Sequence, residues 1–348
     1  VWHCGIYMNK SRETVLLTGA SGFIGLHCTR LLLQSGFKVR GTIRNQEKKN
    51  LVRNLMAAND CDANNLELTQ LDLTSDLGWN AAMQGCDYVM HVASPFWIAN
   101  PKNESDMLTP AVEGTLRVLR AAKKAQVKRV VLTSSIVSMM SSIRRGLFTP
   151  DDWTDVNYPD LSTYIKSKTL AEQAAWDFVN KNKGSTKLDL VVIAPGGVFG
   201  PPVGDDISGQ SLAVLTKMLD GKVPMVPDAA FPMVDVRDVA QLHVSAIKNK
   251  KASGEHFIAS GAEPISFADA AQILLDEGYR GPSTKKAPRW LLRTLAIFDR
   301  EARGMLALVG MYLTADNSKT RDTFDWTPMP FRQSLIETAV AVQNIRNK

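Results

Sequence analysis

The sequence predicts an α/β fold in which a parallel, doubly wound sheet carries helices on both faces. Two observations indicate this fold. Apolar, strand-like runs alternate with longer helix-like segments as far as Pro195, which is the order that parallel sheets require. A glycine-rich turn also joins the first of these runs to the first helical segment. Beyond Pro195 a loop rich in glycine and proline precedes short helices and brief strands, which predict a smaller, mixed α/β C-terminal portion.

The first predicted strand is the apolar run Val15–Leu17, which leads into a turn with three evenly spaced glycines. Gly19 permits the tight turn, Gly22 lets the backbone approach a ligand, and Gly25 lets the following helix lie close to the strand. Apolar residues at helical spacing predict that helix over Gly22–Ser35. Its first N–H groups lack helical partners and suit phosphates, so the turn predicts a dinucleotide site. An ordinary glycine-rich turn without a ligand is the alternative.

Five further strands and two long helices complete the predicted sheet. Arg129–Thr133 is strongly β-branched and apolar, and the long segments read as helices. The strands are predicted at Lys38–Ile43, Leu66–Gln70, Asp87–His91, Arg129–Thr133 and Leu188–Ala194, and the long helices at Glu104–Gln126 and Leu161–Asn182.

This pattern divides the chain into three parts. Residues 14–195, with a returning segment at about 232–255 that includes a helix over Val234–Lys248, form the dinucleotide-binding domain. Residues 196–231 and 256–348 form a smaller substrate-binding domain over the carboxyl ends of the strands, where open α/β sheets bind ligands. Residues 1–13 are expected to be a poorly ordered extension.

Composition and charge exclude several classes of function. The 348-residue chain is 45% apolar and 22% charged, which is ordinary for a globular enzyme. Its net charge of +6 is small and dispersed, which argues against a nucleic-acid partner. No apolar stretch approaches the roughly 18 residues of a membrane span, so we expect no membrane partner. The four cysteines form no C-x-x-C pair, which predicts reduced thiols, a cytoplasmic protein and no metal site.

Tyr164 and Lys168 form a Y-x-x-x-K pair near the start of the second long helix. A spacing of four residues places both side chains on one helix face. We expect the ammonium to lower the pKa of the phenol from about 10, so that Tyr164 exchanges a proton with a carbonyl or alcohol oxygen near neutral pH. The spacing alone is common. Its place between the fifth and sixth predicted strands of a dinucleotide-binding sheet favours a catalytic role over simple packing.

Ser134 and Ser135 follow the strand Arg129–Thr133 at its carboxyl end. A hydroxyl there can donate a hydrogen bond to a reacting oxygen and stabilise the charge that develops on it. We favour Ser135, and a serine-rich strand end that satisfies backbone groups is the alternative. His91 is interpreted as a packed core histidine. Because G-x-S-x-G is absent and histidine is sparse, the sequence does not support a Ser-His-Asp hydrolase.

Together these features resemble the extended short-chain dehydrogenase/reductases of the NAD(P)-dependent epimerase/dehydratase superfamily, and within it the dihydroflavonol reductase-like branch. The resemblance covers about residues 14–260 and implies a Rossmann fold with a nicotinamide cofactor. The matching motifs are TGASGFIG at Thr18–Gly25, DL at Asp72–Leu73, HVAS at His91–Ser94, LTSS at Leu132–Ser135, YIKSK at Tyr164–Lys168, APGGVFGPP at Ala194–Pro202 and VDVRDVA at Val234–Ala240.

The resemblance implies a role for each matched position. Ser135, Tyr164 and Lys168 would be the catalytic trio, and Tyr164 and Lys168 would also contact the cofactor. The other implied cofactor-binding residues are Gly19, Ser21, Gly22, Phe23, Ile24 and Gly25 at the pyrophosphate, Asp72 and Leu73 at the adenine, Val92, Ala93 and Ser94 along the cleft, and Pro195, Gly196, Gly197 and Val198 at the nicotinamide.

The end of the second strand predicts NADP(H) rather than NAD(H). An acidic residue there would hydrogen-bond the adenosine ribose and select NAD. This chain has Arg44 at that place, followed by Lys48 and Lys49. A guanidinium pairs well with a ribose 2′-phosphate, and the lysines add positive charge.

Aromatic and apolar side chains predict the substrate pocket, although each has core packing as its alternative. The family's flavonoid reductases carry an asparagine a few residues beyond the catalytic serine, whereas this chain has Met139 and Met140 there. A polyhydroxylated flavonoid is therefore not the implied substrate. The polar segment Asp151–Asp160 predicts a mobile flap beside the pocket. The candidate pocket residues are Phe96, Trp97, Met140, Trp153 and Phe199.

These features predict an NADPH-dependent reductase of aldehydes or ketones, in which the nicotinamide supplies hydride and Tyr164 supplies the proton. A nucleotide-sugar epimerase or dehydratase, or a hydroxysteroid dehydrogenase, would use the same trio, but an NAD-retaining epimerase fits poorly with Arg44. A non-catalytic NADP-binding sensor on the same fold is a third possibility. The two long helices also make a homodimer a candidate assembly, because such helices pair across a two-fold axis in many relatives.

Overall fold

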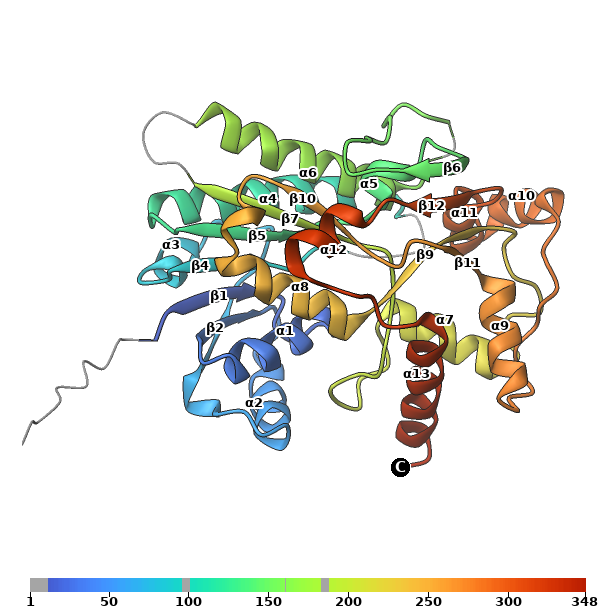
Figure 1. The fold of residues 1–348 in the computed structure, drawn as a ribbon, viewed down its shortest axis with the longest axis horizontal. Helices are drawn as coiled ribbons and strands as arrows, with labels where there is room; N and C mark the ends of the chain where they lie inside the picture. Colours follow the sequence, from blue (N-terminus) through green and yellow to red (C-terminus); the bar gives the residue numbers. More distant parts are fainter. Residues whose placement is uncertain (1–11, 96–100, 160, 183–187) are drawn as a thin grey trace, which may run out of the picture.

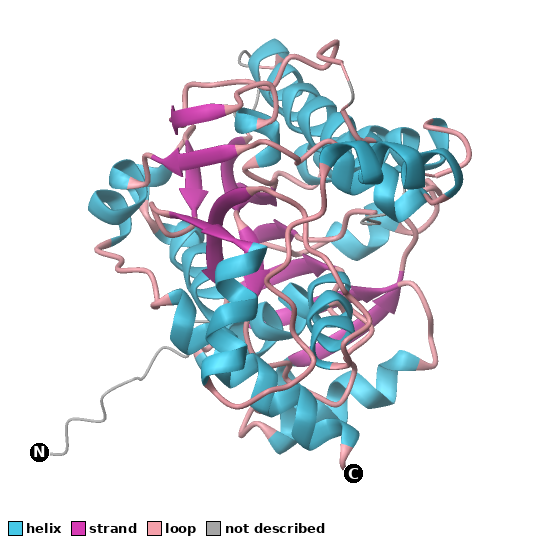
Figure 2. Ribbon diagram, turned by 90° about the vertical axis from the view of Figure 1, so that its right-hand side faces the viewer, coloured by secondary structure: helices cyan, strands magenta, loops and turns pink. Residues whose placement is uncertain are grey.

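The computed structural model describes residues 12–95, 101–159, 161–182 and 188–348. The predicted extension lies almost wholly outside this range, as do Phe96 and Trp97. The described chain forms two sheets with helices packed around them (Figures 1 and 2).

The larger sheet is built mainly from the first part of the chain. Its strands are β1 (Thr14–Thr18), β2 (Lys38–Ile43), β3 (Leu66–Gln70), β4 (Tyr88–His91), β5 (Arg129–Thr133), β7 (Asp189–Pro195) and β10 (His256–Ala259). The helices around it are α1 (Phe23–Gln34), α2 (Lys48–Ala58), α3 (Trp79–Met83), α4 (Ser105–Lys124), α6 (Thr163–Lys181), α8 (Val236–Lys248) and α12 (Ser318–Phe324), with 3-10 turns η1 (Ala63–Asn65) and η2 (Lys250–Ala252).

The smaller sheet comes mainly from the last part of the chain. Its strands are β6 (Arg145–Phe148), β8 (Gly197–Phe199), β9 (Ala230–Asp235), β11 (Pro264–Ser266) and β12 (Tyr312–Ala315). The remaining helices are α5 (Val137–Met140), α7 (Gln210–Leu219), α9 (Phe267–Asp276), α10 (Arg289–Phe298), α11 (Arg300–Leu306) and α13 (Phe331–Arg346).

The larger sheet is parallel throughout, with the strand order β10-β7-β5-β4-β1-β2-β3. The predicted Rossmann-like, doubly wound fold is confirmed. The chain winds outward from β1 to β3 and then returns to β4, so the direction of winding reverses between β1 and β4. Open α/β sheets bind their ligands at the carboxyl ends of the strands at such a reversal.

Alternating side chains on the strands feed two separate hydrophobic cores. In β1, Val15 and Leu17 pack in the core that α1, α2 and α8 cover, whereas Leu16 packs in the core under α3, α4 and α6. Successive strand residues point to opposite faces, so β5 and β7 repeat this pattern. Figure 1 shows α4 and α6 on one side of the sheet and α1 and α8 on the other. Because both faces are covered, the central strands are apolar without interruption.

Two strands correct the predicted division of the chain. β6 lies within residues 14–195 but pairs with β12 of the smaller sheet. β10 lies within residues 256–348 but pairs in parallel with β7, as the seventh strand of the larger sheet. Each strand is only four residues long and pairs with a strand that is far away in the sequence. Local composition therefore does not reveal to which sheet it belongs. The helix predicted over Val234–Lys248 starts at Val236, because Val234 and Asp235 end β9.

Asp235 connects the returning segment with the C-terminal helix. Its carboxylate caps α8 by accepting a hydrogen bond from Arg237 N at 2.7 Å, and it pairs with the Arg237 side chain at 2.8 Å. It also accepts a hydrogen bond from the Ser334 hydroxyl of α13 at 2.6 Å. A buried carboxylate needs such partners to offset its lost hydration. The VDVRDVA motif thus ties α8, which packs on α1, to α13.

Three buried histidines make the fold sensitive to acid. Burial lowers the pKa of His27 and His243 to about 4 and that of His91 to about 3, from an ordinary value of 6.5. The unfolded chain therefore binds protons below pH 6.5 that the native protein does not, so stability is full above that pH and falls as pH drops toward these values. A pKa difference of one is worth about 1.4 kcal/mol, so the loss reaches several kcal/mol by about pH 4.

Urea unfolding at a series of pH values below neutrality measures this loss. In the His243→Asn variant one of the three groups is removed, so the free energy of unfolding should depend less steeply on pH than in the wild type. An equal pH dependence in the two proteins would contradict the assignment to His243.

Candidate active site

The carboxyl ends of three neighbouring strands bring predicted site residues to one edge of the larger sheet. Gly19 follows β1, Ala93 follows β4, and Ser135 lies just beyond β5. The backbone N–H of Ala93 donates to Thr18 Oγ1 at 2.9 Å, and a Cβ on Gly19 would lie 3.1 Å from Ala93 Cα. The glycine turn and the residues after β4 are therefore in contact at the reversal of winding.

The glycine turn has the geometry of a phosphate cradle. Gly19 has a φ of 72°, a left-handed conformation that favours glycine. A Cβ on Gly25 would lie 2.0 Å from Gly19 O, so glycine is needed for α1 to approach the turn. Gly22 is exposed and begins α1 without a side-chain cap. The first N–H groups of α1 are therefore available to an anion. The other residues predicted on this turn, Ser21, Phe23 and Ile24, are partly buried.

Arg44 lies at the carboxyl end of β2, where the sequence predicts recognition of the 2′-phosphate. It is exposed, and its carbonyl accepts a hydrogen bond from Gln70 Nε2 at 3.1 Å. Hydrogen bonds from Thr74 hold the pKa of Asp72 below its ordinary value, and the charge of Arg44 adds to this effect. Arg44 and Asp72 are therefore neighbours at this edge. Lys48 pairs with Asp206 at 3.5 Å, so its ammonium already has a partially exposed partner.

Ser135 and Tyr164 are hydrogen-bonded to each other through their side chains. Tyr164 lies in the first turn of α6, where Ser162 caps the helix by accepting a hydrogen bond from Ile165 N. Burial raises the pKa of Tyr164 to about 12, and the hydrogen bond with Ser135 offsets this only in part. The expected lowering of this pKa is therefore wrong for this structure. The lost hydration of the phenolate outweighs the stabilisation that neighbouring groups provide.

Lys168 is buried one helical turn beyond Tyr164. Its ammonium donates a hydrogen bond to the carbonyl of Thr133 at 3.2 Å. Burial lowers its pKa to about 8, and the charge of Glu172 acts in the opposite direction. His91 is buried nearby, as predicted, and after burial itself the charge of Lys168 is the next cause of its low pKa.

Glu172 is a buried carboxylate that the sequence interpretation missed. It lies on α6 one turn beyond Lys168, and the four-residue spacing is the signal for it in the sequence. Burial acts to raise its pKa, but the bond and charge of His256 and two serine hydroxyls hold the pKa below its ordinary value. Its carboxylate accepts hydrogen bonds from four side chains, namely Ser134, Ser138, His256 and Trp176.

A small polar chamber lies between these groups. It has a volume of about 10 Å³ and is lined mainly by residues of β4, β5, α6 and the segment after β4, including Ala93, Ser94, Lys168 and Glu172. A polar space of this size suits about one water molecule. The predicted cleft residues Ala93 and Ser94 therefore lie beside the buried ammonium.

The residues predicted beside the nicotinamide lie next to Ser135. The Pro195 carbonyl accepts a hydrogen bond from Ser135 Oγ at 3.5 Å. Gly196 and Gly197 are confined by β9, because a Cβ on either would lie 2.5 Å or less from an atom of that strand. Packing against β9 therefore explains both glycines, and their contact with a cofactor stays a prediction.

Residues 15–259 match the NAD dependent epimerase/dehydratase family. The chain belongs to this family. It is 37% identical to a cinnamoyl-CoA reductase of Medicago truncatula, over 70% of this chain and 75% of that protein. It is 31% identical to an anthocyanidin reductase of Vitis vinifera, again over 70% of this chain and 75% of that protein. Yeast methylglyoxal/isovaleraldehyde reductase Gre2, solved in complex with NADPH, is 25% identical with a TM-score of 0.78, over 96% of this chain and 99% of that chain.

These relatives confirm the resemblance to the extended, dihydroflavonol reductase-like branch of the family. Among the helices of the described residues, none combines the length and the apolar character needed to cross a bilayer.

Three of the five residues predicted for the substrate pocket lie within the described residues, and two of these three are buried. Met140 is 1% exposed in the core under the smaller sheet, and Phe199 is 7% exposed with its ring 5.5 Å from that of Phe331. Both side chains pack in hydrophobic cores, and their contact with a substrate stays a prediction. Trp153 lies with its ring 6.0 Å from that of His256, beside the Glu172 carboxylate. The mobile flap over residues 151–160 stays a prediction.

The raised pKa of Tyr164 has a direct spectroscopic test. In cofactor-free protein the phenol should stay protonated at pH 10, because its pKa is about 12. The ultraviolet phenolate absorbance of the wild type and of Tyr164→Phe should therefore be equal at that pH. Ser135→Ala removes the hydroxyl that favours the phenolate, so Tyr164 should titrate no earlier in that variant. A phenolate signal at pH 10 that Tyr164→Phe lacks would show that the pKa is not raised.

Proposed function

We propose that this protein is an NADPH-dependent reductase of aldehydes or ketones. The observation that carries the proposal is the hydrogen-bonded pair of Ser135 and Tyr164, with the buried Lys168 one turn further along α6. These groups lie at the edge of the sheet that also holds the glycine turn, where a dinucleotide would bind. The relatives support the class of reaction, since they are named as reductases and the Gre2 structure contains NADPH.

The glycine turn fits a dinucleotide. Gly22 is exposed at an uncapped helix start, so its neighbours present N–H groups to a pyrophosphate. Arg44 would pair with the 2′-phosphate of NADPH because a guanidinium binds phosphate through two parallel hydrogen bonds. The nicotinamide, when bound, supplies the hydride that reduces the carbonyl carbon.

The side chains of the chain supply the proton and stabilise charge. Tyr164 would donate its phenolic proton to the carbonyl oxygen, and the phenol carries that proton at neutral pH. Ser135 donates a hydrogen bond to the same oxygen and stabilises the negative charge that develops there. Lys168 places a positive charge near the phenolate that remains, which lowers the cost of the transfer.

An epimerase or dehydratase of nucleotide sugars is the second candidate, because the family carries that name. Enzymes that keep NAD bound need an acidic residue to hold the adenosine ribose, and Arg44 occupies that place. The basic residue therefore favours a reductase that uses NADPH as a co-substrate.

Replacement of the phenol tests the proposed mechanism. Tyr164→Phe should lower turnover of simple aldehydes by about 10²–10⁴-fold, the usual contribution of a general acid. Nicotinamide absorbance measures the rate, and fluorescence of bound NADPH measures cofactor affinity, which should change little. Tyr279→Phe is the matched control, because this partly buried tyrosine packs against the core of α7, α9 and α13, away from the trio. Full turnover by Tyr164→Phe would remove Tyr164 from the mechanism.

Replacement of Arg44 tests the choice of cofactor. Arg44→Asp should weaken NADPH binding by about tenfold or more and leave NADH binding much less affected, because the lost interaction is a charge-assisted bond to phosphate. Steady-state KM values for both cofactors measure the effect. Lys48→Gln should have a smaller effect, since Lys48 already pairs with Asp206. Equal losses for NADPH and NADH in Arg44→Asp would refute the assignment.

A further inference from the structure

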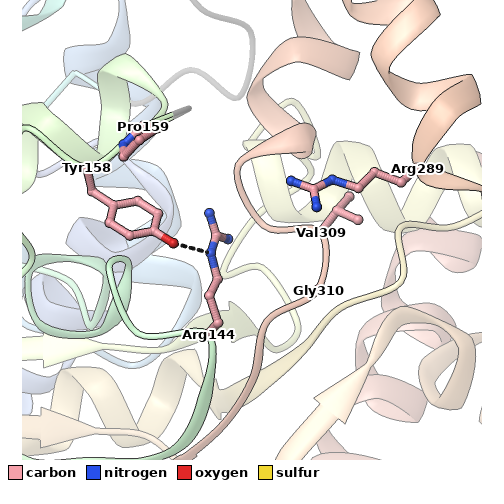
Figure 3. Close-up of a pocket in the computed structure, with 6 residues that line it drawn as sticks. All are labelled: Arg144, Tyr158, Pro159, Arg289, Val309 and Gly310. Atoms are coloured by element: carbon pink, nitrogen blue, oxygen red, sulfur yellow. Dashed lines mark hydrogen bonds between the residues drawn. The ribbon is translucent and has the colours of Figure 1, made fainter.

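A separate cavity of about 350 Å³ lies between the segment before β6 and the start of α10 (Figure 3). None of its lining residues belongs to the glycine turn or to the trio of Ser135, Tyr164 and Lys168. Two of them carry a guanidinium group and none carries a carboxylate. The lining residues are Arg144, Tyr158, Pro159, Arg289, Val309 and Gly310.

Arg144 is held in place at one side of the cavity. Its Nε donates a hydrogen bond to Tyr158 Oη at 3.3 Å, and its Nη1 donates to the Ala307 carbonyl at 2.9 Å. The guanidinium also lies over the Tyr158 ring, 5.1 Å from the ring centre. A guanidinium has five N–H groups, so three of them have no partner among the described residues. The side chain is half-buried and pre-oriented, which is the condition for bidentate binding of an oxyanion.

Arg289 faces the same cavity from the opposite side, and Figure 3 shows its guanidinium pointing toward that of Arg144. It is exposed and forms no ion pair with a described residue. It is also the first residue of the ten-residue helix α10, which Pro288 precedes without a side-chain cap. The partial positive charge of this helix end adds to the two guanidinium charges.

One carboxylate beside this cavity, among the residues that the structure describes, is already paired. Asp228, whose backbone carbonyl accepts a hydrogen bond from Gly310 N, binds Lys286 at 2.7 Å through its side chain and also accepts a bond from Tyr312. Two guanidinium groups that share a cavity repel each other unless an anion lies between them. The wall is also open at Gly310, where an added Cβ would contact nothing within 4 Å.

We propose that this cavity binds an oxyanion, a phosphate or a carboxylate, between Arg144 and Arg289. Its volume lies in the range of small-molecule sites, so it accommodates more than the charged group alone. A guanidinium suits an oxyanion because it can donate two parallel hydrogen bonds. Here Arg144 is held by its own hydrogen bonds, and the exposed Arg289 can contact the anion from the other side.

The cavity is joined to the proposed active site through Tyr158. This side chain packs against the buried cluster of Leu161, Ile165 and Ala307, and Val137 packs against the same cluster. Ile165 is the residue after Tyr164, and the Val137 N–H donates to Ser135 Oγ at 3.4 Å. Because the cavity adjoins the proposed active site, the anion can be the charged end of the carbonyl substrate. This first source rests on the proposed function, and a free anion is the second source.

Calorimetric titration of the full chain with inorganic phosphate tests the site, with NADP⁺ at saturation so that the cofactor's phosphate sites are filled. Arg289→Gln and Arg144→Gln should each weaken phosphate binding by at least about tenfold, the loss of a charge-assisted bond. Arg293→Gln, an exposed arginine one turn along α10, should bind like the wild type. Because Arg289 is exposed, its variant decides the matter even if Arg144→Gln fails to fold. Absence of phosphate binding in the wild type, or equal binding by Arg289→Gln, would overturn the proposal.

Kinetics with two matched aldehydes distinguish the sources of the anion. If the substrate supplies it, Arg289→Gln should raise KM for p-carboxybenzaldehyde by about tenfold and leave KM for p-tolualdehyde unchanged. If a free anion fills the site, both KM values should respond alike while phosphate binding is still lost. Should neither aldehyde be reduced, the proposed reductase function fails, whereas the phosphate titration still decides whether the anion site exists.

Discussion

A buried ammonium constrains the centre of this molecule. Lys168 is withdrawn from water, and a charge in that position is costly unless it is hydrogen-bonded and near an opposite charge. The Thr133 carbonyl and the Glu172 carboxylate meet both needs. Glu172 in turn requires its own donors, which come from the segment after β5, from α6 and from β10. Satisfying one charge thus links α6 to β5, to the segment that follows β5 and to β10.

The same burial sets the protonation of the phenol. Desolvation disfavours the charged form of each group, so it raises the pKa of Tyr164 and lowers that of Lys168. Both shifts favour the neutral form of the group, and the phenol is protonated at neutral pH. The Ser135 hydroxyl then orients the phenol at the edge of the sheet.

Local sequence signals predicted the central elements well and the long-range ones poorly. The bounds of β2, β3 and β5 agree with the predicted strands. The apolar, β-branched run of β5 reports burial at both faces, whereas β3 at the sheet edge alternates buried and exposed residues. The glycine turn was predictable because φ and close packing restrict Gly19 and Gly25 to one residue type. Strands β6 and β10 were not predicted, and each pairs outside the part of the chain to which its residues were assigned, since pairing depends on distant partners. Met140 and Phe199 were assigned to a pocket because composition does not separate an apolar core from an apolar cavity.

The chain passes between its two sheets more than once, since β6 joins the smaller sheet and β10 joins the larger one. The hydrogen bond between Ser334 of α13 and Asp235 is a further link between distant parts of the chain. No single cut therefore separates a cofactor half from a substrate half. A fragment that ended at Pro195 would lack β10 and leave β7 as an open edge, which is prone to aggregation. Hybrids with a new specificity are therefore better built by grafting loops onto an intact scaffold. Joining the N-terminal half of one family member to the C-terminal half of another would disrupt the packed cores on both faces of the larger sheet.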